Sequence, residues 1–481
     1  MVRPTLKGAE PVNGRRLPLP ERAGPALRYL GIGLLAMAVG SATLTFDWII
    51  SHRVDVNLVA EFAGSVIYPS DIFLVGGLAT WVFGWFLSPD KTLRTGPWYT
   101  FLPMLALTVM SVASIIWAVD GPQTAFSALR RSCLFGRYIV MATEFSKALA
   151  PALAALFVFG VLHAVVGLGQ VVAGASLGLS MLGEVTSTYY LDVFIGDSRA
   201  YGLGFNPNPI GLFLAVVIVS AFGLFVLKRV HGPVAILALA VFGVCLLGLM
   251  ATQSRAAMVG GLLGGLTVAI SVFGGSPEFR WSALRRVGII AAFVVLTLGT
   301  LGAGAAILGA LNGPGEPAPR FTLVSQIAQR IGSEDVSRGL QSRTKDWDLA
   351  YPVIRDNVAL GVGAGNFPTA LKNRLNPDTP DGLWVPIHNV FLLNLAKWGV
   401  LGAASWLVIM AAPMLWLLTL KKRTLPRSEA WIWLGPLTVL LTVSLVEFSP
   451  WATQDARLLF PAVLGLWAGA VSYRFDATIL P

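Results

Sequence analysis

The sequence predicts an all-α polytopic integral membrane protein with about twelve transmembrane helices and a large helical loop on one face. Of its 481 residues, 55% are hydrophobic and only 12% are charged, whereas a soluble domain carries about 25% charged residues. So few charges cannot cover the surface of a soluble globule of this size. Because lipid offers no hydrogen-bond partners, every backbone amide in the membrane must form its hydrogen bond within the protein. The long apolar runs are therefore expected to be helices rather than open strands.

The apolar runs are each long enough to cross the hydrocarbon core as a helix, which takes about 20 residues. They predict spans at 28–46, 70–88, 98–118, 122–143, 148–172, 209–227, 233–251, 256–274, 287–311, 399–420, 430–448 and 457–473.

These spans define the expected organisation of the chain. It comprises a basic tail at 1–27, membrane helices 1 to 9 at 28–311 with an outer loop at 173–208, a large loop at 312–398, membrane helices 10 to 12 at 399–473, and a tail at 474–481. The large loop contains an amphipathic stretch in which Trp347, Tyr351 and Ile354 share one helical face. Its turn signals and aromatic residues favour a folded cap.

The orientation follows from the basic residues of the short loops, because cytoplasmic loops retain lysine and arginine. One set of loops contains Lys91, Arg94, Lys147, Lys228, Arg229, Arg280, Arg285, Arg286, Lys421, Lys422, Arg423, Arg427 and Arg474. The opposite set contains only Arg53, Arg199, Arg255 and Arg457. We therefore expect both termini to be cytoplasmic and both long loops to be extracytoplasmic.

The fourth span, 122–143, carries two arginines about two turns below its outer end, Arg130 and Arg131. A charge at that depth costs a few kcal/mol unless it faces a polar cavity. Two interpretations follow: either 122–131 is an interfacial helix, or these arginines line a site.

The net charge of +10 is explained by cytoplasmic basic residues, so we expect no nucleic-acid partner. The two cysteines, Cys133 and Cys245, lie in apolar stretches and read as core residues. His163, deep in an apolar span, reads as a hydrogen-bonded core histidine. We find no metal-spaced His/Cys set, catalytic Ser-His-Asp order or nucleotide fingerprint in the sequence. We therefore expect neither a metal nor a cofactor.

Cationic and imidazole groups gather near membrane level on the expected outer face. Arg199 precedes a Gly-Pro turn, Arg255 lies in a tight hairpin, and His388-Asn389 opens an apolar helix. An arginine between membrane helices is costly unless an anion compensates it, and guanidinium suits phosphate oxygens. Ordinary roles compete: Arg255 as an interfacial residue, Arg199 as a loop residue, His388 as a helix-start residue, and Asn206 as a turn residue.

At these residues the chain resembles the O-antigen ligase and polymerase superfamily of bacterial envelope glycosyltransferases. The resemblance covers roughly residues 195–420. It rests on Arg199 with Gly204-Phe205-Asn206-Pro207-Asn208-Pro209-Ile210-Gly211, Thr252-Gln253-Ser254-Arg255-Ala256-Ala257, Gly361-Val362-Gly363-Ala364-Gly365-Asn366-Phe367, His388-Asn389-Val390-Phe391-Leu392 and Gly399-Val400-Leu401-Gly402.

The resemblance implies a fold of the lipid-sugar-dependent glycosyltransferase type in the bacterial cytoplasmic membrane. It also implies a metal-independent enzyme that takes an undecaprenyl-diphosphate-linked oligosaccharide as donor. Arg199 and Arg255 would hold the diphosphate and His388 would lie beside the reacting groups. Further substrate-binding candidates are Arg343, Asn389, Asn206 and Arg130.

Three functions fit this reading. The first is a polymerase that joins lipid-linked repeat units of a surface polysaccharide. The second is a ligase that moves the glycan to lipid A-core or another acceptor, and the third, of another class, is a flippase for the same lipid-linked sugars. We see no internal repeat of the kind common in transporters. The expected partners are the donor, a glycan or lipid-linked acceptor, membrane lipids, and a chain-length regulator or flippase.

Overall fold

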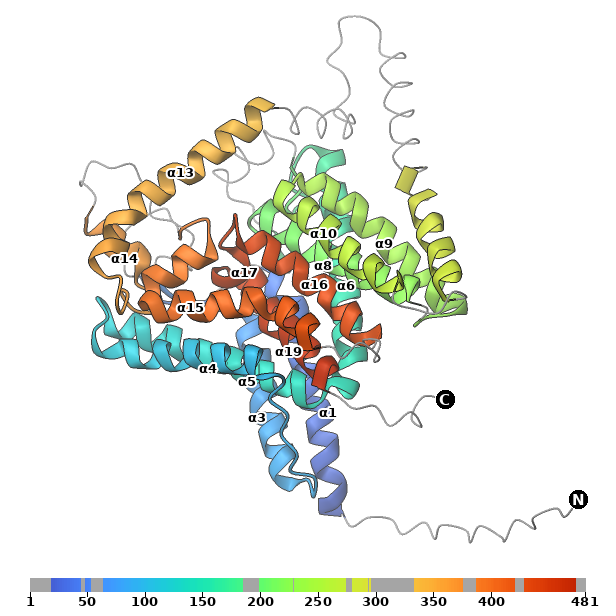
Figure 1. Ribbon diagram of the computed structural model, residues 1–481, viewed down its shortest axis with the longest axis horizontal. Helices are drawn as coiled ribbons and strands as arrows, with labels where there is room; N and C mark the ends of the chain where they lie inside the picture. The colour runs from blue at the N-terminus through green and yellow to red at the C-terminus, as the bar shows by residue number, and fades with distance from the viewer. Residues whose placement is uncertain are drawn as a thin grey trace, which may run out of the picture.

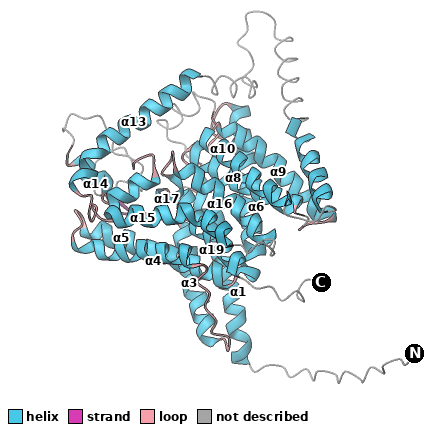
Figure 2. Ribbon diagram, viewed as in Figure 1, coloured by secondary structure: helices cyan, strands magenta, loops and turns pink. Residues whose placement is uncertain are grey.

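The structure is a computed structural model, which describes residues 19–44, 48–52, 64–184, 199–227, 229–273, 279–292, 294–295, 333–374, 386–419 and 428–472. Nearly all of the described elements are helices (Figure 2), and eight of them are long and apolar enough to cross a membrane. These eight are α1 (Leu19–Gly40), α3 (Pro69–Leu87), α4 (Trp98–Ala113), α6 (Phe145–Ala173), α8 (Pro207–Val226), α9 (Gly232–Thr252), α10 (Arg255–Phe273) and α15 (Val390–Thr419). The predicted fold class, an all-α polytopic membrane protein, is confirmed.

The other described helices are less apolar or shorter. They are α5 (Gly121–Thr143), α13 (Ser333–Asp356), α14 (Phe367–Lys372), α16 (Ser428–Ser444), α17 (Ser449–Ala452), α18 (Gln454–Arg457) and α19 (Leu459–Ser472), with 3-10 turns η1 (Ser41–Thr43), η2 (Ser114–Ile116) and η3 (Ser180–Leu182). Residues 279–292 are helical as well. Each predicted span has a matching helix except 287–311, most of which lies outside the described residues. Residues 312–332 and 375–385 of the large loop, residues 185–198 of the other outer loop, the 1–18 tail and residues 473–481 also lie outside them.

Helix α8 is the centre of the membrane core. It is apolar all round because α9, α10 and α16 pack against it and α6 adds further contacts (Figure 1). Its start is well defined, since Pro207 occupies the first turn and the Asn206 Oδ1 atom accepts a hydrogen bond of 2.8 Å from the backbone N–H of Asn208. The same start lies beside the candidate site described below.

Helix α5 is a single helix that carries Arg130, Arg131 and Arg137. These charges explain why α5 is not among the eight helices that are apolar enough to cross a membrane. It packs against α19 and α4. Arg137 is fully buried and donates to the backbone oxygen of Leu35 at 2.5 Å. The structure therefore favours the second interpretation of this span, in which Arg130 and Arg131 line a cavity.

A short β-hairpin interrupts the helical pattern, and the sequence reading did not anticipate it. Strand β1 (Trp48–His52) pairs antiparallel with β2 (Gly64–Ile67). Gln123 fastens the hairpin to the start of α5, because its Oε1 atom accepts from the Ser65 hydroxyl at 2.8 Å and its Nε2 atom donates to the Gly64 oxygen at 3.2 Å.

The glycine turn before α14 is docked onto a break in α15. Helix α15 is interrupted at Trp398 and Gly399, which have non-helical backbone angles. The Val362 and Gly363 amides donate to the Ala396 and Lys397 oxygens at 2.9 and 3.0 Å. Gly399 is required here, because it has φ +63° and an added Cβ would lie 2.1 Å from the Ala359 oxygen. This docking fixes the large loop against the membrane helices.

Candidate functional site

A cavity of about 360 Å³ opens where the starts of α8 and α10, the side of α13 and the end of α16 meet. Its wall includes Arg199, Asn208, Arg255, Arg343, Leu445 and Glu447, and we call it the Arg255 cavity. Its volume falls within the roughly 300–1,000 Å³ of small-molecule sites. Three arginines singled out in the sequence, separated by as many as 144 positions, therefore line one cavity.

The tight turn between α9 and α10 presents Arg255 to this cavity. Gln253 closes α9 in the left-handed conformation with φ +53°, and Arg255 is the first residue of α10. A cation in the first turn of a helix opposes the helix dipole instead of complementing it. The Arg255 charge therefore does not stabilise α10 by itself. An anion in the cavity would offset the unfavourable interaction between this charge and the helix dipole.

Arg199 and Arg343 reach the cavity through a shared network. The Arg199 side chain donates to the Thr252 oxygen at 3.0 Å and to Asn208 Oδ1 at 2.8 Å. The Asn208 amide nitrogen in turn donates to Glu447 Oε1 at 3.1 Å, and Arg343 donates to the same oxygen at 2.9 Å. The Glu447 carboxylate, which lies just after the end of α16, thus positions Asn208 of α8 and Arg343 of α13.

Glu447 was missed by the sequence reading, which looked for a compensating acid near each arginine along the chain. Its side chain is only 4% exposed and forms an ion pair with Arg343, which lies 104 positions away. Glu447 lies at the end of an apolar span, and no local pattern distinguishes it. The correction is that one carboxylate compensates part of the positive charge, so an anionic ligand would have to counter only the remainder.

His388 is held beside the cavity by contacts from two directions. Its Nδ1 atom lies 2.6 Å from Asp346 Oδ2 on α13, one turn after Arg343. Its ring packs edge-on against Phe448, with the centroids 4.8 Å apart. Asn389 starts α15, since its Oδ1 atom accepts from the Leu392 amide at 3.0 Å, and its Nδ2 atom donates to the Leu445 oxygen at 2.8 Å.

The remaining predicted residues lie elsewhere. Asn206 caps α8 and is not among the described lining residues of the Arg255 cavity, whereas its neighbour Asn208 is. Arg130 lines a different cavity, described below. His163 is a core histidine as expected, hydrogen-bonded to Thr43 and accepting from the Leu203 amide at 3.2 Å. In the part of the chain that the structure describes, His, Cys, Asp and Glu side chains form no cluster suited to a metal ion.

The arrangement brings anion-binding guanidinium groups next to an imidazole whose other side is held by a carboxylate. Because the Asp346 carboxylate accepts a hydrogen bond, the proton of neutral His388 is on Nδ1 and the lone pair on Nε2. Such an imidazole can accept a proton from a hydroxyl group, while the arginines can hold a negatively charged leaving group.

A comparison with known protein families covers part of this site. The O-antigen ligase family model matches residues 240–407, which include Arg255, Arg343 and His388. No curated protein matches the chain. The matched region holds two of the three arginines, the imidazole and the break in α15 with its docked glycine turn. The match over residues 240–407 supports membership of the O-antigen ligase and polymerase superfamily, and the eight long apolar helices support a multi-pass membrane protein.

Proposed function

We propose that this protein transfers glycan from an undecaprenyl-diphosphate-linked oligosaccharide and so polymerises the repeat units of a surface polysaccharide. The observation that carries the proposal is the convergence of Arg199, Arg255 and Arg343 on one cavity beside His388. A diphosphate offers several oxygens to these donors, and guanidinium groups bind such oxygens in pairs.

The proposed reaction is a displacement at the anomeric carbon of the donor. The acceptor hydroxyl oxygen forms a bond to that carbon, and the bond from the carbon to the diphosphate oxygen breaks. The hydroxyl proton passes to His388 Nε2, and Asp346 stabilises the imidazolium that results. Undecaprenyl diphosphate leaves with the bonding electrons, and the cavity arginines stabilise its growing negative charge.

We also propose that this reaction takes place on the extracytoplasmic face of the bacterial inner membrane, with both termini in the cytoplasm. The loop charges support this orientation, since the basic residues concentrate in the loops on the side opposite Arg199 and Arg255. In this arrangement the boundaries expected from the sequence apply: membrane helices at 28–311 and 399–473, and an extracytoplasmic loop at 312–398.

A ligase is the second candidate, and the description of the matching family favours it. Polymerase and ligase would use the same donor and differ only in acceptor, so the Arg255 cavity serves both. A flippase would move the intact donor and would not need a held imidazole. Chain-length regulators and flippases are proposed as partners of the polymerase.

The deciding experiment supplies purified protein with undecaprenyl-diphosphate oligosaccharide in the presence of a chelator. Release of undecaprenyl diphosphate together with longer lipid-linked glycan supports the polymerase. Transfer only when lipid A-core is added supports the ligase and overturns polymerisation. Movement of intact donor across vesicles without bond cleavage overturns both. Persistence of activity under chelation supports metal independence.

A further inference from the structure

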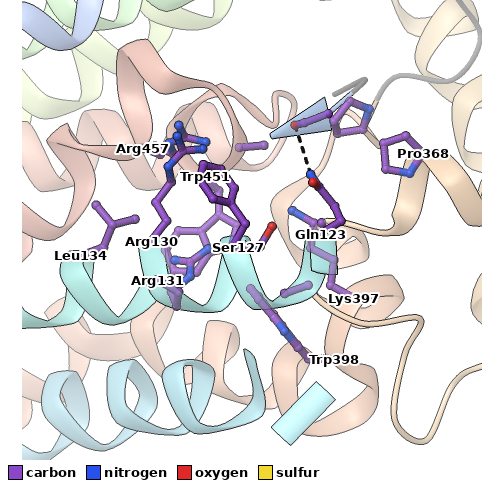
Figure 3. Close-up of a pocket in the computed structure, with 16 residues that line it drawn as sticks. Gln123, Ser127, Arg130, Arg131, Leu134, Pro368, Lys397, Trp398, Trp451 and Arg457 are labelled. Atoms are coloured by element: carbon purple, nitrogen blue, oxygen red, sulfur yellow. Dashed lines mark hydrogen bonds between the residues drawn. The ribbon is translucent and has the colours of Figure 1, made fainter. Parts of the chain in front are cut away.

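A second cavity is lined by several positively charged side chains. Its wall includes Arg130 and Arg131 of α5, Lys397 and Trp398 at the break of α15, Trp451 of α17 and Arg457 of α18 (Figure 3). We call it the Arg131 cavity. It shares none of its described lining residues with the Arg255 cavity.

Four cationic side chains line this small cavity: Arg130, Arg131, Lys397 and Arg457. Arg130 forms an ion pair with Asp71, with the Nη2 and Oδ2 atoms 2.6 Å apart. Among the described residues that line the cavity there is no aspartate or glutamate. Arg131 lies over the rings of Trp451 and Trp398, at 4.1 and 5.2 Å from their centroids. Four cations around one small cavity raise the local positive potential, so the cavity is suited to an anionic ligand.

The size of the cavity limits that anion. Its volume is about 90 Å³, which is room for roughly six to nine water-sized spheres. A phosphate group fits this space, whereas an oligosaccharide does not. Arg457 is about nine-tenths buried and is held by Gln454, which is itself hydrogen-bonded to Ser70. The guanidinium is therefore fixed in place by neighbouring side chains.

An apolar groove adjoins the cavity and shares Arg130 with it. The groove runs between α3 and α5, has a volume of about 450 Å³ and is lined by Ile72, Leu74, Val75, Phe126 and Leu129 as well as Arg130. Its lining is almost wholly apolar, and the Arg130 guanidinium lies 4.6 Å from the Phe126 ring centroid. A polar pocket with an apolar groove at its mouth matches a phosphate group attached to a hydrocarbon chain.

Two short segments place this cavity next to the one that holds the proposed donor. In the first, Pro386 lines the Arg131 cavity, while Asn389 bonds to Leu445 of the Arg255 cavity. In the second, Glu447 lines the Arg255 cavity and Trp451 lines the Arg131 cavity. His388 and Phe448, which pack against each other, belong to these two segments and so lie between the cavities.

We propose that the Arg131 cavity and the α3–α5 groove form a second lipid-phosphate site, which binds the phosphate and hydrocarbon chain of the acceptor lipid. The acceptor role rests on the proposed function, whereas the binding site itself does not. Arg131 and Arg457 hold the phosphate oxygens, Arg130 and its Asp71 partner mark the boundary between headgroup and chain, and the acceptor glycan extends toward His388. A lipid phosphate is the occupant that satisfies both the charge and the groove.

The test measures equilibrium binding of labelled undecaprenyl phosphate to the full chain in nanodiscs. The variants are the pair Arg131→Gln/Arg457→Gln, the pair Arg199→Gln/Arg255→Gln, and the exposed control Arg285→Gln. Wild type and control are expected to show two classes of site, and each double variant to lose a different one. Loss of two charge-assisted hydrogen bonds weakens binding by at least about tenfold. A folded Arg131→Gln/Arg457→Gln variant that keeps both classes overturns the proposal.

Further measurements distinguish binding of the phosphate from binding of the hydrocarbon chain, and one more variant covers the case of misfolding. Leu129→Trp changes an exposed position in the groove. This variant is expected to bind undecaprenyl phosphate more weakly and inorganic phosphate as well as wild type does. Equal binding of neutral undecaprenol would contradict the role of the cations. If the Gln pair does not fold, Arg131→Lys/Arg457→Lys keeps the charge and is expected to retain the site. Because binding needs no turnover, failure of glycan transfer would remove the acceptor role but leave the lipid-phosphate site standing, and loss of the site would leave the transfer proposal standing.

Discussion

The Nδ1 atom of His388 lies 2.6 Å from the Oδ2 atom of Asp346. The two residues are 42 positions apart, one at the start of α15 and one on α13. The contact fixes the imidazole so that Nε2 is available as a base, and it connects the large loop directly to the chemistry proposed for the site.

Asp346→Asn is expected to lower kcat by about 10²-fold or more and to leave donor binding nearly unchanged. The amide can stabilise neither the required tautomer nor the imidazolium. Steady-state transfer assays that separate kcat from KM check this result. Asp348→Asn is the matched control, because Asp348 is exposed on the same helix. Equal activity of the two variants would remove Asp346 from the mechanism.

Glu447→Ala is expected to destabilise the protein by about 1–3 kcal/mol. The substitution leaves Arg343 and Asn208 without the oxygen to which both donate, in a place where the carboxylate is only 4% exposed. Glu447→Gln should lose less stability, since the glutamine amide oxygen can still accept both hydrogen bonds. Thermal unfolding in detergent measures the difference. An unchanged midpoint for the Ala variant would show that the network contributes nothing to stability.

Gly399→Ala is expected to reduce stability by about 1–3 kcal/mol and to loosen the glycine turn from α15. The left-handed backbone and the Ala359 oxygen leave no room for a methyl group. Gly265→Ala is the control, because a Cβ there meets nothing within 4 Å. Limited proteolysis of the 312–398 loop should be faster in the Gly399 variant only. Similar cleavage of both variants would mean that the docking does not hold the loop.

Much of the membrane fold follows from local sequence. Helices α8, α9 and α10 begin and end within two residues of the predicted spans, because apolar length and Pro or Asn signals are local properties. The β1–β2 hairpin was missed because its strands are short, and its attachment to Gln123 depends on residues far along the chain.

The site was only partly predictable, for a different physical reason. Its arginines and histidine could be singled out as costly polar groups near the membrane, but their partners come from distant helices. On α13, Trp347 and Tyr351 are exposed, whereas Ile354, which was expected to share their face, is buried together with Ala350 and Val353. Arg343 and Asp346 continue the buried face toward the site. Helical periodicity gives the candidate faces of α13, but only its packing against α14 and α15 determines which face is buried.

The most direct test of the account is the rate at which undecaprenyl diphosphate is released from a lipid-linked oligosaccharide donor by purified variants. Arg255→Ala is expected to lower this rate by at least about 10²-fold while membrane insertion is retained. His388→Ala is expected to fall similarly, and the exposed control Arg285→Ala should match wild type. Wild-type release rates in both Arg255→Ala and His388→Ala would contradict a glycan-transfer site in this cavity.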